Sequence, residues 1–536
     1  MIRHGVLSGL VAGSALSAQV RPKPAAPVSR IQAAWISAHI RFLADRYLEG
    51  RETGKRGAEI AARYVAAQFE ALGLAPLGAD SSLLLPVPLR YSELDPAGST
   101  LELAGPSGAR TLEPTIDYLI HADKTRDSVD LAGEVVFVGW GVTAPERGYD
   151  DYRGVDVRGK IVAMVFGGPP SLPPDERGHF ASMAVKERNA LAHGAIGVVT
   201  LMPAPGPKLG RGLGQLEGFD WPDADGRPRS PFFEAGVVVR LTDRGTEALF
   251  ESAGRSFPEV AAALAKGQVT FPTHASLHLR ARFRHRPVIA SNTAALLEGS
   301  DPRLKHEYLV YSAHMDHIGV GEPVEGDSVY HGAIDNAGGT AVMMAVARAF
   351  ATGPRPKRSI IFLAVTGEEK GILGSDYFVH HPPVPIEQIV ADVNLDNFVL
   401  TDPVKDLVAY GAAYSTLDSV ANRVIRGMGL GVSEDALPWM TIFTRSDHYT
   451  FMRRGVPAVM LFPGKASGLG TQTGVEAQRA WFDHIHHTPR DRFDQAIDWK
   501  GAVLYGEANL RLGYAVANAS GRPSWRGTKP WFFREP

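Results

Sequence analysis

Two glutamates, Glu368 and Glu369, stand side by side directly after the apolar segment SIIFLAVTG. Adjacent carboxylates at the end of a buried strand repel each other and lose hydration, so the pair requires a compensating positive charge. A divalent cation would remove that repulsion, and the two glutamates would then be free to do different work. The pair therefore indicates where a metal site should be sought.

Further polar side chains follow apolar segments in the same part of the chain, and they are His314, Asp316, His317, Asp335 and Asp396. Taken singly, each has an ordinary structural explanation, such as a helix-capping aspartate or a buried histidine with a hydrogen-bond partner. Together they form a rarer coincidence, which one or two cations would explain. Because the chain has no cysteine, the ligands of any metal must come from histidine, aspartate and glutamate.

The apolar segments around these residues predict the fold. EYLVYSAH, SIIFLAVTG, IVADVNLD and VPAVMLF lack strict alternation, and expected helices lie between them, including 336–351 and another after Gly371. Such segments are typical of strands buried on both faces of a largely parallel sheet. We predict an α/β fold in which a mixed, largely parallel sheet is sandwiched by helices. Ligands of such a sheet gather at the carboxyl ends of the strands.

Residues 115–274 differ from the rest of the chain in their pattern of apolar segments. Short β-branched segments such as GEVVFVGWGV, GKIVAMVF and AIGVVTLM are separated by glycine and proline. This pattern predicts a separate small β-rich domain. The catalytic domain would then consist of residues 31–114 and 275–522, followed by a C-terminal tail over 523–536. A chain of 536 residues is long enough for more than one domain.

The first 30 residues predict export. Arg3 and His4 precede a mildly apolar stretch, small residues lead to Ala18, and a proline-rich segment follows. This is typical of a signal peptide over 1–18 and a spacer over 19–30, and an uncleaved membrane anchor is the alternative. We expect a periplasmic or secreted protein without a transmembrane segment. A net charge of -2 gives no sign of a nucleic-acid partner.

Five motifs in order, SAHMDHIG, GAIDNAGGTAVMMAVA, VTGEEKGILGS, NLDN and HHTPRD, resemble the secreted di-zinc aminopeptidases of the bacterial leucyl aminopeptidase and aminopeptidase Y type. GYDDYRGVDVRGKIV and NALAHGAIGVV resemble the protease-associated domain that is often inserted ahead of the catalytic sheet. The resemblance implies the zinc-exopeptidase fold, two zinc ions per chain and peptide substrates with a free N-terminus.

The resemblance also implies roles for the residues at matching positions. One zinc would be bound by His314 and Asp396 and the other by Glu369 and His487, with Asp335 bridging both. Glu368 would be the general base, because it can take a proton from the attacking water. Asp316 would orient His314 by accepting its ring N–H.

His487 is preferred as a ligand because HTPRD matches the family pattern His-Thr-x-x-Asp. We expect the neighbouring His484 and His486, like His317, to be structural or supporting residues. Asp491 would fix a loop, and Tyr449 with the surrounding TIFTRSDHYTF would shape the wall of the substrate pocket.

Three alternatives use the same scaffold. A carboxypeptidase of the glutamate-carboxypeptidase type would need a cationic pocket, for which Arg445 is the only nearby suggestion. A glutaminyl cyclase usually lacks the inserted domain, and a receptor-like binding module would have lost ligands that are present here. Neither the preferred N-terminal residue nor the oligomeric state is predicted.

Overall fold

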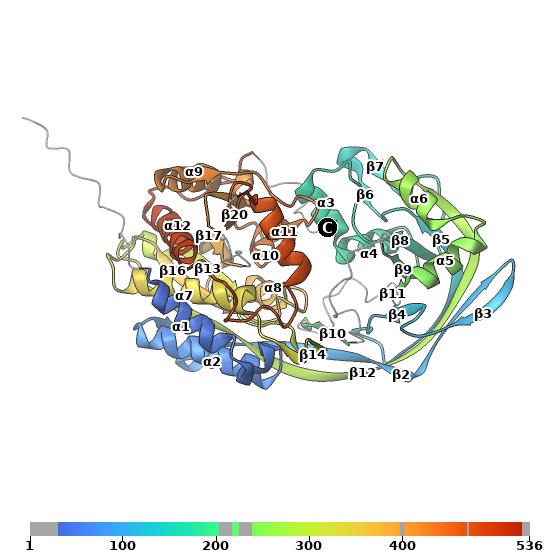
Figure 1. Cartoon of the computed structure of the whole chain (residues 1–536), viewed down its shortest axis with the longest axis horizontal. Helices are drawn as coiled ribbons and strands as arrows, with labels where there is room; N and C mark the ends of the chain where they lie inside the picture. The colour runs from blue at the N-terminus through green and yellow to red at the C-terminus, as the bar shows by residue number, and fades with distance from the viewer. Residues whose placement is uncertain (1–30, 203–216, 224–237, 397–402, 469–470, 528–536) are drawn as a thin grey trace, which may run out of the picture.

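The computed structural model describes residues 31–202, 217–223, 238–396, 403–468 and 471–527. The predicted signal peptide and spacer, and most of the predicted tail, lie outside the described residues. Figure 1 shows two lobes side by side, which we call the catalytic lobe and the inserted lobe. The catalytic lobe holds both the earliest described residues and the C-terminal helix α12 (Trp499–Asn518).

The sheet of the catalytic lobe is built on four parallel strands, whose spatial order is β20-β17-β13-β16. They are β13 (Tyr308–His314), β16 (Ser359–Val365), β17 (Ile389–Asn394) and β20 (Ala458–Pro463). Antiparallel strands flank them, with β18 (Asp406–Tyr410) beside β20 and β12 (Thr270–Leu297) beside β16. This confirms the predicted mixed, largely parallel sheet.

Helices cover both faces of this sheet, which explains why its strands are apolar throughout. Every residue of β16, β17 and β20 is buried. One face carries α12 and three further helices that contact one another: α1 (Ala33–Leu43), α2 (Arg56–Ala71) and α7 (Gly339–Ala351). The other face carries α8 (Leu373–His380) and α10 (His448–Arg453).

Two long strands connect the lobes. β12 pairs with β16 near its C-terminal end and with β5 (Ser128–Val138) near its N-terminal end. β2 (Leu84–Gly105) runs antiparallel to β12 through both lobes (Figure 1). Beyond β5 the inserted lobe continues through β8 (Ile161–Val165), β9 (Gly197–Leu201), β11 (Val238–Leu241) and β4 (Tyr118–Ile120). It is β-rich, as expected.

The inserted lobe has a hydrophobic core of its own. That core includes residues outside 115–274, such as Leu101 and Leu103 of β2 and Leu277 and Leu279 of β12. The boundaries of the inserted domain, and its likeness to a protease-associated domain, therefore stay predictions. Within the described part of the chain, no helix has the length and apolar composition needed to cross a membrane.

Candidate active site

The carboxyl ends of the central strands bring the predicted site residues together. His314 is the last residue of β13, and Asp396 lies two residues beyond the end of β17. After β16 the chain turns at Gly367, whose φ of 72° favours glycine, and Glu368 and Glu369 follow that turn. Asp335 lies in the helical turn Ala333–Gly338 that leads into α7.

Asp335 lies at the centre of the cluster, and its two carboxylate oxygens face two different groups of residues, which we call the two halves of the cluster. Oδ1 is 3.3 Å from Nε2 of His314, which is 3.0 Å from Oδ1 of Asp396. Oδ2 is 3.2 Å from Nε2 of His487, which is 3.0 Å from Oε2 of Glu369. This is the arrangement expected for a carboxylate shared by two ligand sets.

The carboxylate of Asp335 fits a cation better than it fits hydrogen bonding. Asp335 is 1% exposed, and neither carboxylate oxygen has a hydrogen-bond partner of suitable geometry within the described residues. Buried polar atoms are rarely left in that condition. Histidine nitrogens and carboxylate oxygens are ligands that zinc accepts together. The residues present therefore fit a zinc site.

The pKa shifts of Asp335 and His487 show that the buried carboxylates of the cluster are stabilised by neighbouring positive charge. Burial opposes ionisation of Asp335, yet the imidazoles of His314, His486 and His487 hold its pKa well below the usual range. Burial also opposes protonation of His487, but Glu369 and Asp335 raise its pKa to about 10. A bound cation would meet the same demand and displace the imidazole protons.

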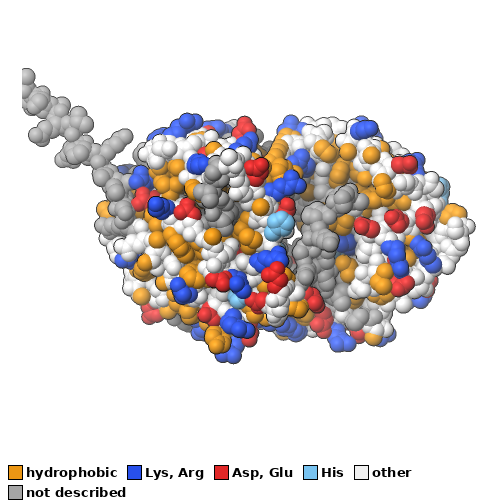
Figure 2. Space-filling view, viewed as in Figure 1, with side chains coloured by type: hydrophobic (Ala, Val, Ile, Leu, Met, Phe, Trp, Pro, Cys, Tyr) orange, Lys and Arg blue, Asp and Glu red, His pale blue; other side chains and the backbone are white. Residues whose placement is uncertain are grey.

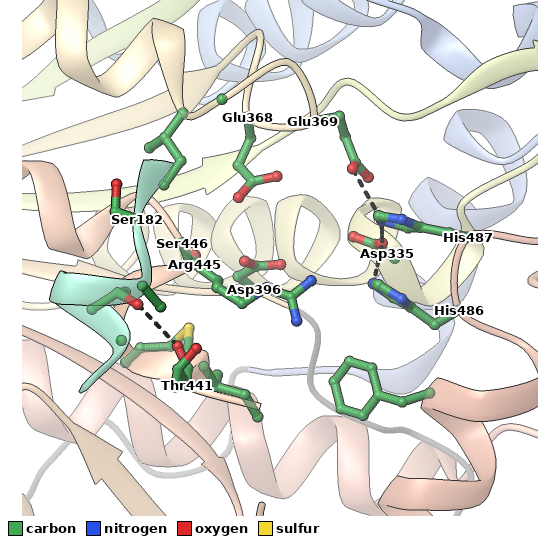
Figure 3. Close-up of a pocket in the computed structure, with 18 of the residues that line it drawn as sticks. Ser182, Asp335, Glu368, Glu369, Asp396, Thr441, Arg445, Ser446, His486 and His487 are labelled. Carbon is green, nitrogen blue, oxygen red and sulfur yellow. Dashed lines mark hydrogen bonds and ion pairs between the residues drawn. The ribbon is translucent and has the colours of Figure 1, made fainter. Parts of the chain in front are cut away.

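Glu368 differs from Glu369 in its surroundings. Burial raises the pKa of Glu368 well above its usual range, and the charges of Asp396, Glu369 and Asp447 add to the effect against that of His314. Glu369 instead contacts His317 and His487, and these contacts lower its pKa against the effect of burial. Figure 3 shows the Glu368 carboxylate pointing into a pocket that Asp396 also borders.

Asp316 is placed differently from the expectation. The Nδ1 atom of His314 lies 3.2 Å from the backbone oxygen of Asp316 and 3.9 Å from its carboxylate. That carboxylate accepts the hydroxyl of Thr53 at 2.8 Å and the backbone N–H groups of Glu368 at 3.2 Å and Glu369 at 3.4 Å. Asp316 thus holds the turn that carries the two glutamates, while its backbone orients His314.

The sequence interpretation missed Arg51, which is fully buried behind the cluster. Its guanidinium donates to the backbone oxygens of Met315 at 2.8 Å, His331 at 2.6 Å and Gly332 at 2.8 Å, and also to that of Leu43. It therefore ties the segment after β13 to the loop that carries Asp335. A fully buried arginine follows LEG in LEGRETGKRG, but nothing local in that motif indicates burial.

Asp491 supports the same loop from the C-terminal side, as expected. Its carboxylate accepts the backbone N–H groups of Ile334 at 2.9 Å and Asp335 at 2.9 Å. Arg51 and Asp491 together fix the backbone of the loop, so the carboxylate of Asp335 keeps its position between the two halves.

Two histidines that were set aside lie closer to the cluster than expected. Nδ1 of His317 is 2.9 Å from Oε1 of Glu369, and Nε2 of His486 is 3.2 Å from Oδ2 of Asp335. His486 stacks on His487 with ring centroids 3.7 Å apart. Two groups of described residues have the spacing of metal ligands: His314, Asp335 and Glu369, and Asp335, His486 and His487.

The cluster opens into a cavity of about 420 Å³ between the lobes. The catalytic lobe contributes Asp335, Glu368, Glu369, Asp396, Arg445, His486 and His487, and the inserted lobe contributes Phe166, Gly178, Ala181, Ser182 and Met183. Phe166 directly follows β8, and the other four come from the region of α3 (Pro174–Ala181) and α4 (Met183–Ala192), which faces the cluster. Figure 2 shows histidine side chains beside the hollow between the lobes.

The segment before Tyr449 lines the cavity as predicted, through Thr441, Ile442, Thr444, Arg445 and Ser446, but Tyr449 itself is not among the lining residues. Its hydroxyl lies 2.5 Å from Nδ1 of His179 in α3, so it joins the two lobes. The contact could not be anticipated because His179 is 270 residues away in the sequence.

Comparison with known proteins points to one family. Residues 292–512 match the sequence model of peptidase family M28. Aminopeptidase YwaD of Bacillus subtilis is 30% identical over 211 residues, which are 38% of this chain and 42% of that protein. Mouse aminopeptidase NAALADL1 is 32% identical over 140 residues, 25% of this chain and 17% of that protein. The chain therefore matches less than half the length of either relative.

A solved structure supports the fold over most of the chain. It is an aminopeptidase from Aneurinibacillus sp. strain AM-1, with a TM-score of 0.55 and 20% sequence identity. The superposition covers 92% of this chain and 96% of that one, so it includes both lobes.

Proposed function

Residues 292–512 form a domain of peptidase family M28, and from that premise we propose that the chain is a di-zinc metalloaminopeptidase. The observation that carries the proposal is Asp335, which turns one carboxylate oxygen to His314 and Asp396 and the other to Glu369 and His487. The names of the Bacillus, mouse and Aneurinibacillus relatives support the aminopeptidase activity.

The proposed ligand sets follow the two halves of the cluster. His314 and Asp396 hold one zinc, Glu369 and His487 hold the other, and Asp335 holds both. When bound, zinc supplies a Lewis acid that lowers the pKa of a water molecule and polarises the substrate carbonyl. The Asp316 carboxylate fixes the turn that carries Glu368 and Glu369. It therefore positions both the proposed proton acceptor, Glu368, and the proposed ligand, Glu369.

Glu368 is the general base of the proposed reaction. Its carboxylate faces the pocket and contacts no histidine, whereas Glu369 is engaged with two. Glu368 takes the proton of the attacking water and passes it to the nitrogen of the leaving group as the peptide bond breaks. Asp396 and Glu368 also supply negative charge for the free α-amine of the substrate.

The first test is hydrolysis of aminoacyl-p-nitroanilides by the full-length protein, beside the same substrates with acetylated N-termini. We expect cleavage of the free substrates only, with loss of activity on chelation and recovery with zinc. The control is Glu368→Gln, which should retain about two zinc ions while kcat falls about 10²- to 10⁴-fold. A zinc-loaded, folded protein that cleaves blocked and free substrates equally would contradict the proposal.

A second test separates the neighbouring histidines. We expect His487→Ala to lose about one zinc equivalent, measured by elemental analysis, and His486→Ala to retain both. The reverse result would transfer the ligand role to His486, whose Nε2 is equally close to Asp335.

We also propose that the protein is exported after removal of residues 1–18, as the leader composition indicates. Mass spectrometry of the protein recovered outside the cytoplasm should give a chain that begins after Ala18. An intact N-terminus on all recovered protein would contradict this.

A further inference from the structure

Arg445 is a cation in the active-site cavity that the proposed mechanism does not use. It follows the short helix η10 (Ile442–Thr444), and its backbone N–H donates to the oxygen of Ile442 at 3.0 Å. The next two residues are buried and bonded: Ser446 accepts from Nδ2 of Asn394 at 2.6 Å, and Asp447 accepts from Oγ of Ser375 at 2.6 Å. The guanidinium therefore stands on a well-anchored backbone.

The guanidinium of Arg445 faces the cavity and has no partner among the residues that the structure describes. Figure 3 shows it extending into the pocket between Asp396 and His486. Among the described residues that line the cavity, Arg445 is the only lysine or arginine. The described residues offer its side chain no hydrogen bond within 3.5 Å and no ion pair within 4.0 Å, and the residue is exposed to solvent.

Other cations near the junction of the lobes are already engaged. Arg177 of α3 donates to the backbone oxygen of Pro438 at 2.6 Å, and Lys370 pairs with Glu52 at 3.0 Å and Glu217 at 3.2 Å. Two acids of the cavity also have histidine partners, because Asp396 contacts His314 and Glu369 contacts His487. A planar guanidinium with free donors in such a pocket is suited to bind a carboxylate through two parallel hydrogen bonds.

We propose that Arg445 binds the C-terminal carboxylate of the substrate, so that dipeptides with both termini free are the preferred substrates. This inference rests on the proposed function. The acids of the cluster would take the α-amine at one end, and Arg445 would take the carboxylate at the other. An extended chain advances about 3.3–3.6 Å per residue, so in a dipeptide the carboxylate lies within one residue of the scissile bond.

The inserted lobe supports a short substrate because it covers the cavity. Ser182 and Met183, at the junction of α3 and α4, line the cavity, and Phe166 also borders it. Figure 3 shows Ser182 at the edge of this pocket. A volume of about 420 Å³ lies at the lower end of the range for small-ligand sites, about 300–1,000 Å³. It suits a molecule of two residues better than a long peptide.

The kinetic test compares leucyl-glycine with leucyl-glycinamide, which differ only in the terminal carboxylate. We expect the native enzyme to prefer the free acid by about 10- to 100-fold in kcat/KM, as for hydrogen bonds to charged groups. Arg445→Met should abolish that preference and leave leucyl-p-nitroanilide and the amide unchanged, whereas Arg445→Lys should keep part of it. The matched control is Arg479→Met, on the exposed side of α11 (Gly474–His484).

A binding test separates this inference from the proposed activity. Calorimetry on zinc-loaded Glu368→Gln protein should give tighter binding of the dipeptide than of its amide, with the difference lost in Glu368→Gln/Arg445→Met. If no variant hydrolyses any substrate but this difference is present, the proposed function fails and the role of Arg445 stands. Equal affinities of the native Arg445 protein for acid and amide, or a preference that survives Arg445→Met, would overturn it. Cleavage of acetyl-leucyl-glycine but not of the amide would keep the Arg445 contact and indicate a carboxypeptidase.

Discussion

Both lobes of this protein bury ionisable groups, but Asp151 and Lys186 of the inserted lobe have different partners from Asp335 of the catalytic lobe. In the inserted lobe, Asp151 accepts the backbone N–H groups of Trp140 and Val142 and the hydroxyl of Tyr149, and Lys186 donates to the backbone oxygen of Val165. In the catalytic lobe, the Asp335 carboxylate accepts from no backbone donor of the described segments and faces imidazoles instead.

The electrostatic outcome differs accordingly. Burial raises the pKa of Asp151 to about 6 and lowers that of Lys186 to about 7, so both shifts favour the neutral forms. Asp335 keeps its charge, because three imidazoles oppose the effect of burial. A buried ionisable group thus indicates a ligand site when charged side chains face one another, and a structural role when the backbone satisfies it.

Metal removal should have the largest effect, and it tests whether the charged cluster around Asp335 is a metal site. A chelator should reduce activity to background and lower the free energy of unfolding by about 3–4 kcal/mol relative to protein with zinc at 100 to 1,000 times its Kd. The measurement is thermal unfolding with and without zinc, beside the activity. Lys186→Met should retain native zinc content, and loss of zinc in that variant would contradict the separation of the lobes.

Arg51→Met tests whether the backbone support of the Asp335 loop matters to the site. The variant loses the donors to His331 and Gly332, so the loop should hold Asp335 less firmly. We expect zinc affinity to fall about 10- to 100-fold, as for other residues that orient ligands from behind. Competition with a zinc indicator is the measurement. Arg41→Met on the neighbouring helix α1 is the control, and unchanged affinity in Arg51→Met would refute the role.

Gly178→Leu tests the contact between the lobes and its effect on substrate length. A Cβ at this position would lie 2.6 Å from Oγ1 of Thr444, so a larger side chain must push α3 away from η10. Overpacking of this kind costs about 1–3 kcal/mol. We expect KM for dipeptides to rise about tenfold while that for tetrapeptides changes less, as measured by steady-state kinetics. An equal rise for both lengths would contradict a covering role of the inserted lobe.

The smallest effect on activity is expected from Lys186→Met, which tests the inserted lobe alone. The folded pKa of about 7 lies below the unfolded value of about 10.4, so between these values the unfolded chain binds more protons and stability rises with pH. The native protein should therefore gain stability relative to Lys186→Met by up to about 1.4 kcal/mol per pH unit in that window. Urea unfolding at several pH values measures the difference, and parallel curves would contradict it.

Much of the catalytic lobe was accessible from sequence because its signals are local. The apolar segments that end at His314, Val365 and Asn394 form β13, β16 and β17, and parallel packing brings their ends to one edge. The grouping of His314, Glu369 and Asp396 follows from that topology. Asp335 lies in the turn before α7 and His487 follows α11, and His487 was chosen from the family motif. The ligand roles and the general base stay predictions until metal content and kinetics are measured.

Other features depend on contacts between distant segments. Arg51 reaches Gly332 across 281 residues, and His179 meets Tyr449 across 270 residues. The local periodicity of a sequence carries no information about contacts between segments so far apart. The buried Arg51 was therefore missed, and Tyr449 was assigned to the pocket wall and not to the contact between the lobes. The same reason explains why β12, which serves both lobes, was divided at a domain boundary.

The amino-acid sequence by itself determined the strands, the helices between them and the chemical types of the side chains at the strand ends, because periodicity and composition act over a few residues. Only the tertiary structure decided which oxygen of Asp335 faces which histidine, that Asp316 holds the Glu368 turn, and that Arg445 lines the cavity. Those facts arise mainly from packing within the catalytic lobe, where distances of a few ångströms join residues that lie far apart in the sequence.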